Sequence, residues 1–164
     1  MTMTLEQALV AALDDEYRAR ATYRAVLDAY GDVRPFVNIV ESEERHIQAL
    51  ERLCERHGVA IPPDPWPSRV SAPASLEAAC EAALEAEREN GVLYAQLMNA
   101  AEGHADVEET FRRLLTASQD NHLPAFERAL ERERRGGGGR GPRREGRRHR
   151  RRGARAPGPG AEKR

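Results

Sequence analysis

The chain carries one pattern of polar residues twice, a Glu-x6-Tyr pair followed by a Glu-x2-His or Gln-x2-His pair. The first copy consists of Glu16, Tyr23, Glu43 and His46, and the second of Glu87, Tyr94, Gln119 and His122. A spacing of three places an acid or amide and a histidine on adjoining parts of one helical face. When four helices aim such groups inward at one height, they form a dinuclear metal site.

Buried carboxylates favour the same chemistry. A carboxylate without a partner is very costly inside a protein, so several at one depth make sense when cations lie between them. Oxygen ligands with one imidazole per metal suit iron or manganese. Each Glu-x2-His taken alone is typical of a solvated helical face, and Glu43 lies within an acidic run. The joint pattern of two copies therefore carries the prediction.

Four helices are needed to position these residues, and residues 1–135 show helical periodicity four times. We expect the helices at about Thr4–Tyr30, from Asp32 to His57, from Ser75 to near Gly103, and from Asp106 to about 135, the last opening with a capping box at Asp106 and Glu109. The first and last connections are short, so each half is an antiparallel hairpin. This predicts an all-α fold.

The middle connection, residues 59–75, is Pro-rich and long enough to change the topology. Extended, it reaches on the order of 55 Å, whereas a helix of about 25 residues is roughly 38 Å long. It can therefore cross the whole bundle and start the third helix parallel to the second, with Trp66 holding it to the surface. Counted from Gly31, Glu16 lies 15 residues before and His46 lies 15 after, which places them at one height.

Charge divides the chain into two predicted parts, a bundle at 1–135 and a tail at 136–164. The tail holds ten arginines and Lys163 against two glutamates, so its net charge is +9, whereas the whole chain is at −1. We predict that the tail is disordered. It either neutralises nucleic-acid phosphates non-specifically, with strong salt dependence, or is solvated without a dedicated partner.

The N-terminal sequence and the two cysteines predict the cellular location and limit the redox chemistry of the chain. The chain has no N-terminal apolar run, so we expect no signal peptide, no membrane span and a cytoplasmic location. Cys54 and Cys80 are far apart and form no Cys-x2-Cys motif, so we expect neither a disulfide nor a rubredoxin-like iron site.

With its Glu, Tyr and His repeats, the chain from residue 1 to about 135 resembles the ferritin-like di-iron superfamily and is rubrerythrin-like in its pattern. Asn121–Phe126 also resembles a group of bacterial and archaeal ferritin-like domains of unknown function. The resemblance implies a crossover four-helix bundle that commonly forms a homodimer. It implies two iron ions, with manganese as an alternative, held by the terminal ligands Glu16 and Glu87, the bridging ligand Glu43, and the nitrogen ligands His46 and His122.

Gln119 departs from the rubrerythrin pattern, which has a second bridging glutamate at this place. An amide is neutral and cannot bridge two cations as a carboxylate does. Asp120 is the alternative ligand, but it is rotated by about 100° round the helix. Pro124 removes a backbone hydrogen bond to residue 120, and a kink or π-bulge there would turn Asp120 inward.

The expected function is a peroxidase-type or ferroxidase-type reaction, with peroxide, dioxygen or Fe(II) as the small substrate. Tyr23 and Tyr94 either contact the metal ligands and take part in the redox reaction, or are core residues whose hydroxyls cap a polar patch. One alternative is a metal-free ferritin-like scaffold or interaction module, which Gln119 favours and the two histidines oppose. The other is a nucleic-acid-associated protective protein that acts through the basic tail.

Overall fold

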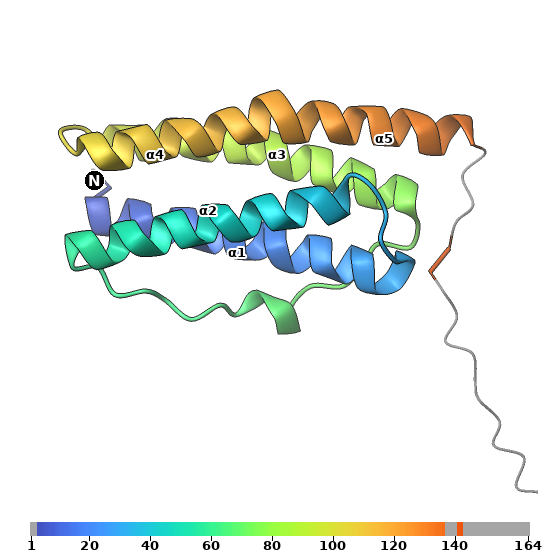
Figure 1. Ribbon diagram of the computed structural model, residues 1–164, viewed down its shortest axis with the longest axis horizontal. Helices are drawn as coiled ribbons and strands as arrows, with labels where there is room; N and C mark the ends of the chain where they lie inside the picture. Colours follow the sequence, from blue (N-terminus) through green and yellow to red (C-terminus); the bar gives the residue numbers. More distant parts are fainter. Residues whose placement is uncertain (1–2, 137–140, 143–164) are drawn as a thin grey trace, which may run out of the picture.

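The protein is an all-α bundle. The computed structural model describes residues 3–136 and 141–142, and within them no strand is present (Figure 1). The elements are α1 (Leu5–Tyr30), α2 (Phe36–His57), the short 3-10 helix η1 (Trp66–Ser68), α3 (Leu76–Ala100), α4 (Ala105–Thr116), the π-helical segment η2 (Ala117–His122) and α5 (Leu123–Arg135). Because α4, η2 and α5 follow one another without a break, they form the fourth long helix of the bundle. The predicted basic tail falls almost entirely outside the described residues.

Local chemistry explains why most helices begin and end where the sequence predicts. Thr4 caps α1 through a reciprocal pair of hydrogen bonds with Gln7, and Ser75 Oγ accepts from the backbone N–H of Ala78 at the start of α3. Gly58 closes α2 with φ at 68°, a left-handed conformation that favours glycine.

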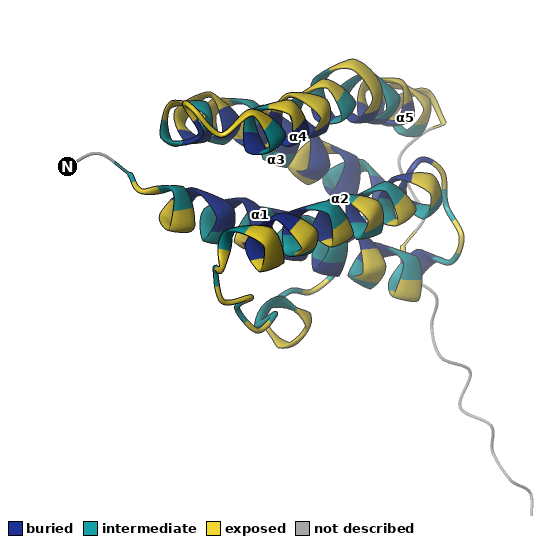
Figure 2. Cartoon of the chain, turned by 60° about the vertical axis from the view of Figure 1, so that its left-hand side comes forward, coloured by how far each residue is buried: buried dark blue, intermediate teal, exposed yellow. Residues whose placement is uncertain are grey.

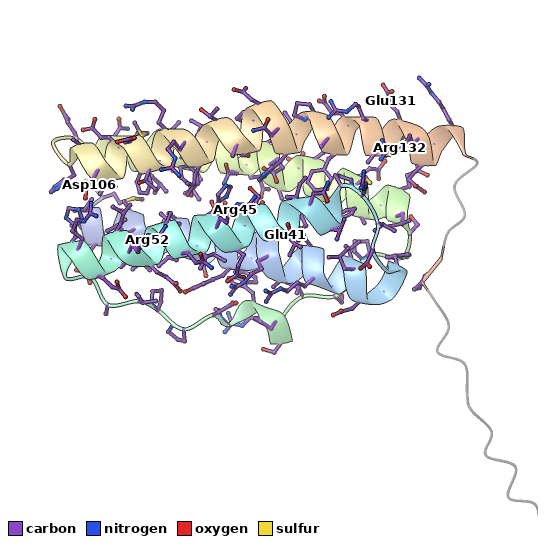
Figure 3. All side chains as sticks on the ribbon, viewed as in Figure 1. Glu41, Arg45, Arg52, Asp106, Glu131 and Arg132 are labelled. Atoms are coloured by element: carbon purple, nitrogen blue, oxygen red, sulfur yellow. The ribbon has the colours of Figure 1, made fainter. Side chains whose placement is uncertain are left out.

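The predicted start of the second helix and the predicted cap of the fourth helix are wrong. α2 begins at Phe36 rather than directly after Asp32, and Pro35 occupies its N-cap position. The capping box of the fourth helix is absent, since α4 begins at Ala105 with no side-chain cap. The Asp106 carboxylate instead accepts from Arg56 and His57 at the end of α2, at 3.0 and 3.1 Å. Asp106 is labelled in Figure 3 at the end of the bundle where α4 begins.

The connection between α2 and α3 runs along the outside of the bundle, so that α2 and α3 point in the same direction (Figure 1). Trp66 attaches this connection, because its Nε1–H donates to Asp14 Oδ1 at 2.8 Å. Arg20 adds a second attachment, with one guanidinium nitrogen 2.9 Å from Asp64 and the other 2.8 Å from Glu44. Within the described part of the chain, no helix is long and apolar enough to cross a bilayer.

The core consists of two apolar clusters at different heights in the bundle, and Figure 2 shows the buried faces of the helices turned toward each other. The first cluster includes Leu9, Leu13, Leu50, Leu97 and Phe111. The second includes Val26, Phe36, Ile39, Leu84 and Phe126. Cys54 lies in the first cluster and Cys80 in the second, and both are free thiols.

Candidate metal centre

Three buried glutamates and two histidines converge inside the bundle. Glu16 comes from α1, Glu43 and His46 from α2, Glu87 from α3, and His122 from the end of η2. The three glutamates and His122 are only 3–4% exposed. Buried carboxylates of this kind must be neutralised, paired or bound to metal.

The distances divide the five side chains into two groups that share one carboxylate. His46 Nδ1 lies 3.1 Å from Glu16 Oε2 and 2.9 Å from Glu43 Oε2. His122 Nδ1 lies 3.2 Å from Glu43 Oε1 and 3.4 Å from Glu87 Oε1. Within each group, the ligand atoms all lie within 4.8 Å of one another. Glu43 therefore presents one oxygen to each group.

Ser42 orients both imidazoles. Its hydroxyl oxygen lies 3.3 Å from His46 Nε2 and 3.2 Å from His122 Nε2. The two rings are stacked, with centroids 5.7 Å apart and planes inclined by 22°. A partner on the far ring nitrogen fixes the orientation of a metal-binding histidine, and here it directs both Nδ1 atoms toward the carboxylates.

Two tyrosines hold the outer glutamates from the opposite hairpin. The Tyr94 hydroxyl in α3 donates to Glu16 Oε1 at 2.7 Å, and the Tyr23 hydroxyl in α1 donates to Glu87 Oε1 at 2.9 Å. Burial, followed by the charge of the glutamate that each one contacts, raises the pKa of both tyrosines well above the ordinary value. Both phenols therefore stay protonated and act as donors near neutral pH.

The charges of the cluster also shift the pKa values of its own members. Burial lowers the pKa of His46, but hydrogen bonds with Glu16 and Glu43 outweigh it and raise that pKa to about 10. The same competition, with Glu43 and Glu87 as partners, raises the pKa of His122 to about 9. Burial and the charge of Glu43 raise the pKa of Glu16 to about 8. Burial would raise the pKa of Glu43, but hydrogen bonds from His122 and His46 lower it below its usual range.

The structure does not bring Gln119 or Asp120 into the cluster, which corrects the sixth predicted ligand. Gln119 Nε2 donates to the main-chain oxygen of Glu87 at 2.8 Å and to Ser118 Oγ at 3.2 Å. Asp120 is exposed. The buried Ser118 occupies the inward position instead, and its hydroxyl donates to Glu87 Oε2.

The π-helical geometry of η2 explains this difference. A π-helix has more residues per turn than an α-helix. Ser118, four residues before His122, therefore shares the helical face of His122, whereas Gln119, three residues before it, lies to one side of that face. Ser118 therefore points inward and Gln119 points toward α3. Gly91 makes room for the amide, because a Cβ at this position would lie 3.0 Å from Gln119 Nε2. A π-helical segment is present just before Pro124, where a kink or π-bulge was the condition for Asp120 to turn inward, but Asp120 stays exposed.

Sequence reasoning missed the two serines as site residues, although the repeat contained the signal. Ser42 and Ser118 both directly precede the acid or amide of a Glu/Gln-x2-His pair. Asp15 and Asn90 were also missed; the Asn90 amide donates to Asp15 Oδ2 at 2.9 Å beside the cluster. No repeated spacing marks that pair.

A cavity of about 340 Å³ connects the cluster with the surface between α1 and α3. Its inner end is lined by Glu16, Glu43, His46 and Glu87, and alanines from both helices contribute to its walls. Exposed residues of α3, Glu85 and Glu89, are part of the lining. The cavity is therefore large enough for a small oxidant or a metal ion to reach the carboxylates.

Comparisons with known proteins support the fold and leave the chemistry open. No family model and no curated protein matches the sequence. The chain is similar to the solved structure of hypothetical protein MJ0754 from Methanococcus jannaschii, with a TM-score of 0.68 and 22% identity over 77% of this chain and 79% of that one. It is also similar to hypothetical protein rv2844 from Mycobacterium tuberculosis, with a TM-score of 0.60 and 19% identity over 76% of this chain and 88% of that one. At these identities the likeness shows the fold alone.

Proposed function

We propose that this chain is a ferritin-like protein with a dinuclear site for iron, or for iron and manganese, that reacts with peroxide or dioxygen or oxidises Fe(II). The observation that carries the proposal is the position of Glu43. Its two carboxylate oxygens face two different groups, each of which adds one further carboxylate and one imidazole nitrogen. This is the donor arrangement that a bridging carboxylate between two ions requires.

The distances within each group fit a metal ion. Two ligand atoms about 2.1 Å from an ion and at right angles to each other are about 3.0 Å apart. The contacts of the two Nδ1 atoms with the carboxylate oxygens range from 2.9 to 3.4 Å. Three carboxylates and two imidazoles are also the donor set that iron and manganese accept.

The connectivity supports the ferritin-like part of the proposal. Two antiparallel helix pairs, α1 with α2 and α3 with α4–α5, are joined by one long connection that crosses the bundle (Figure 1). Bundles with a single long crossover place their di-metal ligands on facing helices at mid-height. The polar cluster lies at such a height, between the two apolar clusters.

The surrounding residues prepare the site for redox chemistry. Iron, when bound, would supply the electrons that reduce peroxide or dioxygen, and a redox partner or further Fe(II) would replace them. The hydroxyls of Tyr23 and Tyr94 hold the outer glutamates in position, and Ser42 holds the imidazoles. The apolar clusters above and below close the site along the bundle axis, and the cavity between α1 and α3 leaves a lateral route to the carboxylates.

Elemental analysis tests the proposal. The chain is purified without chelators, and iron, manganese and zinc are measured in the wild type and in a His46→Ala/His122→Ala variant. His57→Ala/His104→Ala is the matched control, because these histidines contact each other at the end of the bundle with ring centroids 5.4 Å apart. We expect about two ions per chain in the wild type and the control, and none in the site variant.

A metal-free scaffold is the second candidate, and two observations favour it. Each imidazole lies within hydrogen-bond distance of two carboxylates, so protonated His46 and His122 would satisfy the cluster without metal. Ser118 in place of a second bridging acid points the same way. A wild-type chain that is fully helical, contains no metal and takes up no added Fe(II) would establish this candidate and refute the first.

A further inference from the structure

The outer part of the cavity is acidic. Asp15, Glu85 and Glu89 contribute carboxylates to its lining, against one guanidinium from Arg18. The Asp15 side chain is only 11% exposed, whereas Glu89 is 57% exposed, so the carboxylates follow the cavity inward from the surface. A cleft lined by one sign of charge concentrates ions of the opposite sign. This end of the cavity therefore attracts cations.

Asn90 offers a free oxygen in the same lining. The residue is 8% exposed, and its bond to Asp15 Oδ2 uses Nδ2, so this bond does not satisfy Oδ1. Within the described part of the chain, Oδ1 is the only buried side-chain nitrogen or oxygen without a hydrogen-bond partner. An unsatisfied buried acceptor costs stability and calls for an explanation. Amide and carboxylate oxygens together are ligands for hard divalent cations.

Arg18 occupies the place beside Asp15 that such a cation would take. Its Nη2 lies 2.8 Å from Asp15 Oδ1 and 3.6 Å from Glu89 Oε2, and its guanidinium carbon lies 5.9 Å from the ring centroid of Trp66. The side chain is 40% exposed. Because Glu89 and Trp66 remain available as partners, the guanidinium can leave Asp15 without losing all of its favourable contacts.

We propose that this part of the cavity is a transit site for divalent cations, in which Asp15 and Asn90 Oδ1 hold an ion on its way to the buried cluster. Arg18 turns toward Glu89 when the ion arrives and returns to Asp15 when it has passed. The next ligand on the path is Glu16, the neighbour of Asp15 in the chain. This inference rests on the proposed function, because the dinuclear centre is the destination of the ion.

The rate of metal uptake tests the transit site separately from the dinuclear centre. Chelator-treated, metal-free protein is mixed with Co²⁺, and uptake is followed by the visible absorption of bound cobalt in stopped flow. Asp15→Asn and Asn90→Leu should slow uptake by roughly tenfold, the lower end of what electrostatic focusing contributes. Both should still bind about two ions per chain at equilibrium. Glu41→Gln is the matched control, since it removes the same charge from the exposed face of α2 (Figure 3) and should leave the rate unchanged.

Arg18→Gln provides the opposite perturbation, and we expect faster uptake because the competing cation is gone. Helical content by circular dichroism accompanies each measurement, and Arg18→Gln keeps the inference testable where Asp15→Asn does not fold. Wild-type rates in Asp15→Asn, Asn90→Leu and Arg18→Gln, with two ions bound, would overturn the transit site and leave the dinuclear centre standing. A wild-type chain that binds no cobalt would overturn both.

Discussion

Replacing Tyr94 by phenylalanine removes one hydroxyl from the candidate metal centre and little else. The ring is fully buried, and its edge contact with Phe111, with centroids 5.5 Å apart, does not depend on the hydroxyl. The loss is therefore the 2.7 Å hydrogen bond to Glu16 Oε1. Tyr17→Phe is a matched control in the same helix bundle, because its hydroxyl donates to Glu51 over 3.3 Å in a partly buried position.

The expected cost depends on pH, because the pKa of Glu16 is raised to about 8. Below that value Tyr94 donates to a neutral carboxylic acid, and losing such a bond costs about 1 kcal/mol. Above it the acceptor is a buried carboxylate, and the cost rises to about 2–3 kcal/mol. For a domain of this size, 2 kcal/mol lowers the melting temperature by roughly 6–10 °C. Tyr17→Phe should cost about 0.5 kcal/mol at either pH, because its bond is long and partly solvated.

Urea unfolding of the metal-free protein, followed by circular dichroism at pH 6 and pH 9, measures both variants. Metal affinity gives a second readout, because losing a partner behind a metal ligand costs about 10–100-fold, whereas Tyr17→Phe should leave affinity unchanged. If Tyr94→Phe lowers the free energy of unfolding by the same amount as Tyr17→Phe, both at pH 6 and at pH 9, the reasoning about Glu16 is refuted.

Three further predictions concern charge and packing at the site. The pKa values of His46 and His122 are raised to about 10 and 9 from an unfolded value of about 6.5. Their contribution to the stability of the metal-free protein is therefore complete below pH 6.5 and is lost as pH rises to 10. A melting temperature that rises between pH 6.5 and 10 would contradict this prediction. Metal uptake at pH 7 should release up to three protons, from these histidines and Glu16, as measured by titration calorimetry in two buffers; no release argues against the ligand set. Helix propensity alone predicts that Gly91→Ala raises the free energy of unfolding by about 1 kcal/mol. We expect no such gain, because the new Cβ would lie 3.0 Å from Gln119 Nε2. Urea unfolding that shows the full gain would contradict this packing.

Local rules were enough to predict from the sequence the all-α class and most helix ends. Thr4 and Ser75 form the caps their types favour, and Gly58 adopts a left-handed conformation. The convergence of Glu43 and His46 also follows from a local rule, since residues three apart share a helical face. Such features depend on neighbours in sequence, so the sequence contains them.

Two of the errors occur where a tertiary contact decides the outcome. Gln119 points away from the cluster because the π-helical turn carries it toward Gly91 and the main-chain oxygen of Glu87. The contacts that hold the Gln119 side chain lie on another helix, so its sequence neighbours do not specify its direction. For a similar reason Asp106 does not cap its helix, because its carboxylate accepts hydrogen bonds from Arg56 and His57 at the end of the bundle. In both cases a partner distant in sequence overrode the local preference.

The shared carboxylate of Glu43 gives the two halves of the chain unequal roles in assembly. All three donors of one group, Glu16, Glu43 and His46, belong to the α1–α2 hairpin, so that hairpin alone contains a full set for one ion. The other group needs Glu87 and His122 from the second hairpin. An ion there would link the two hairpins, and the cooperativity of their unfolding would depend on whether that one position is filled.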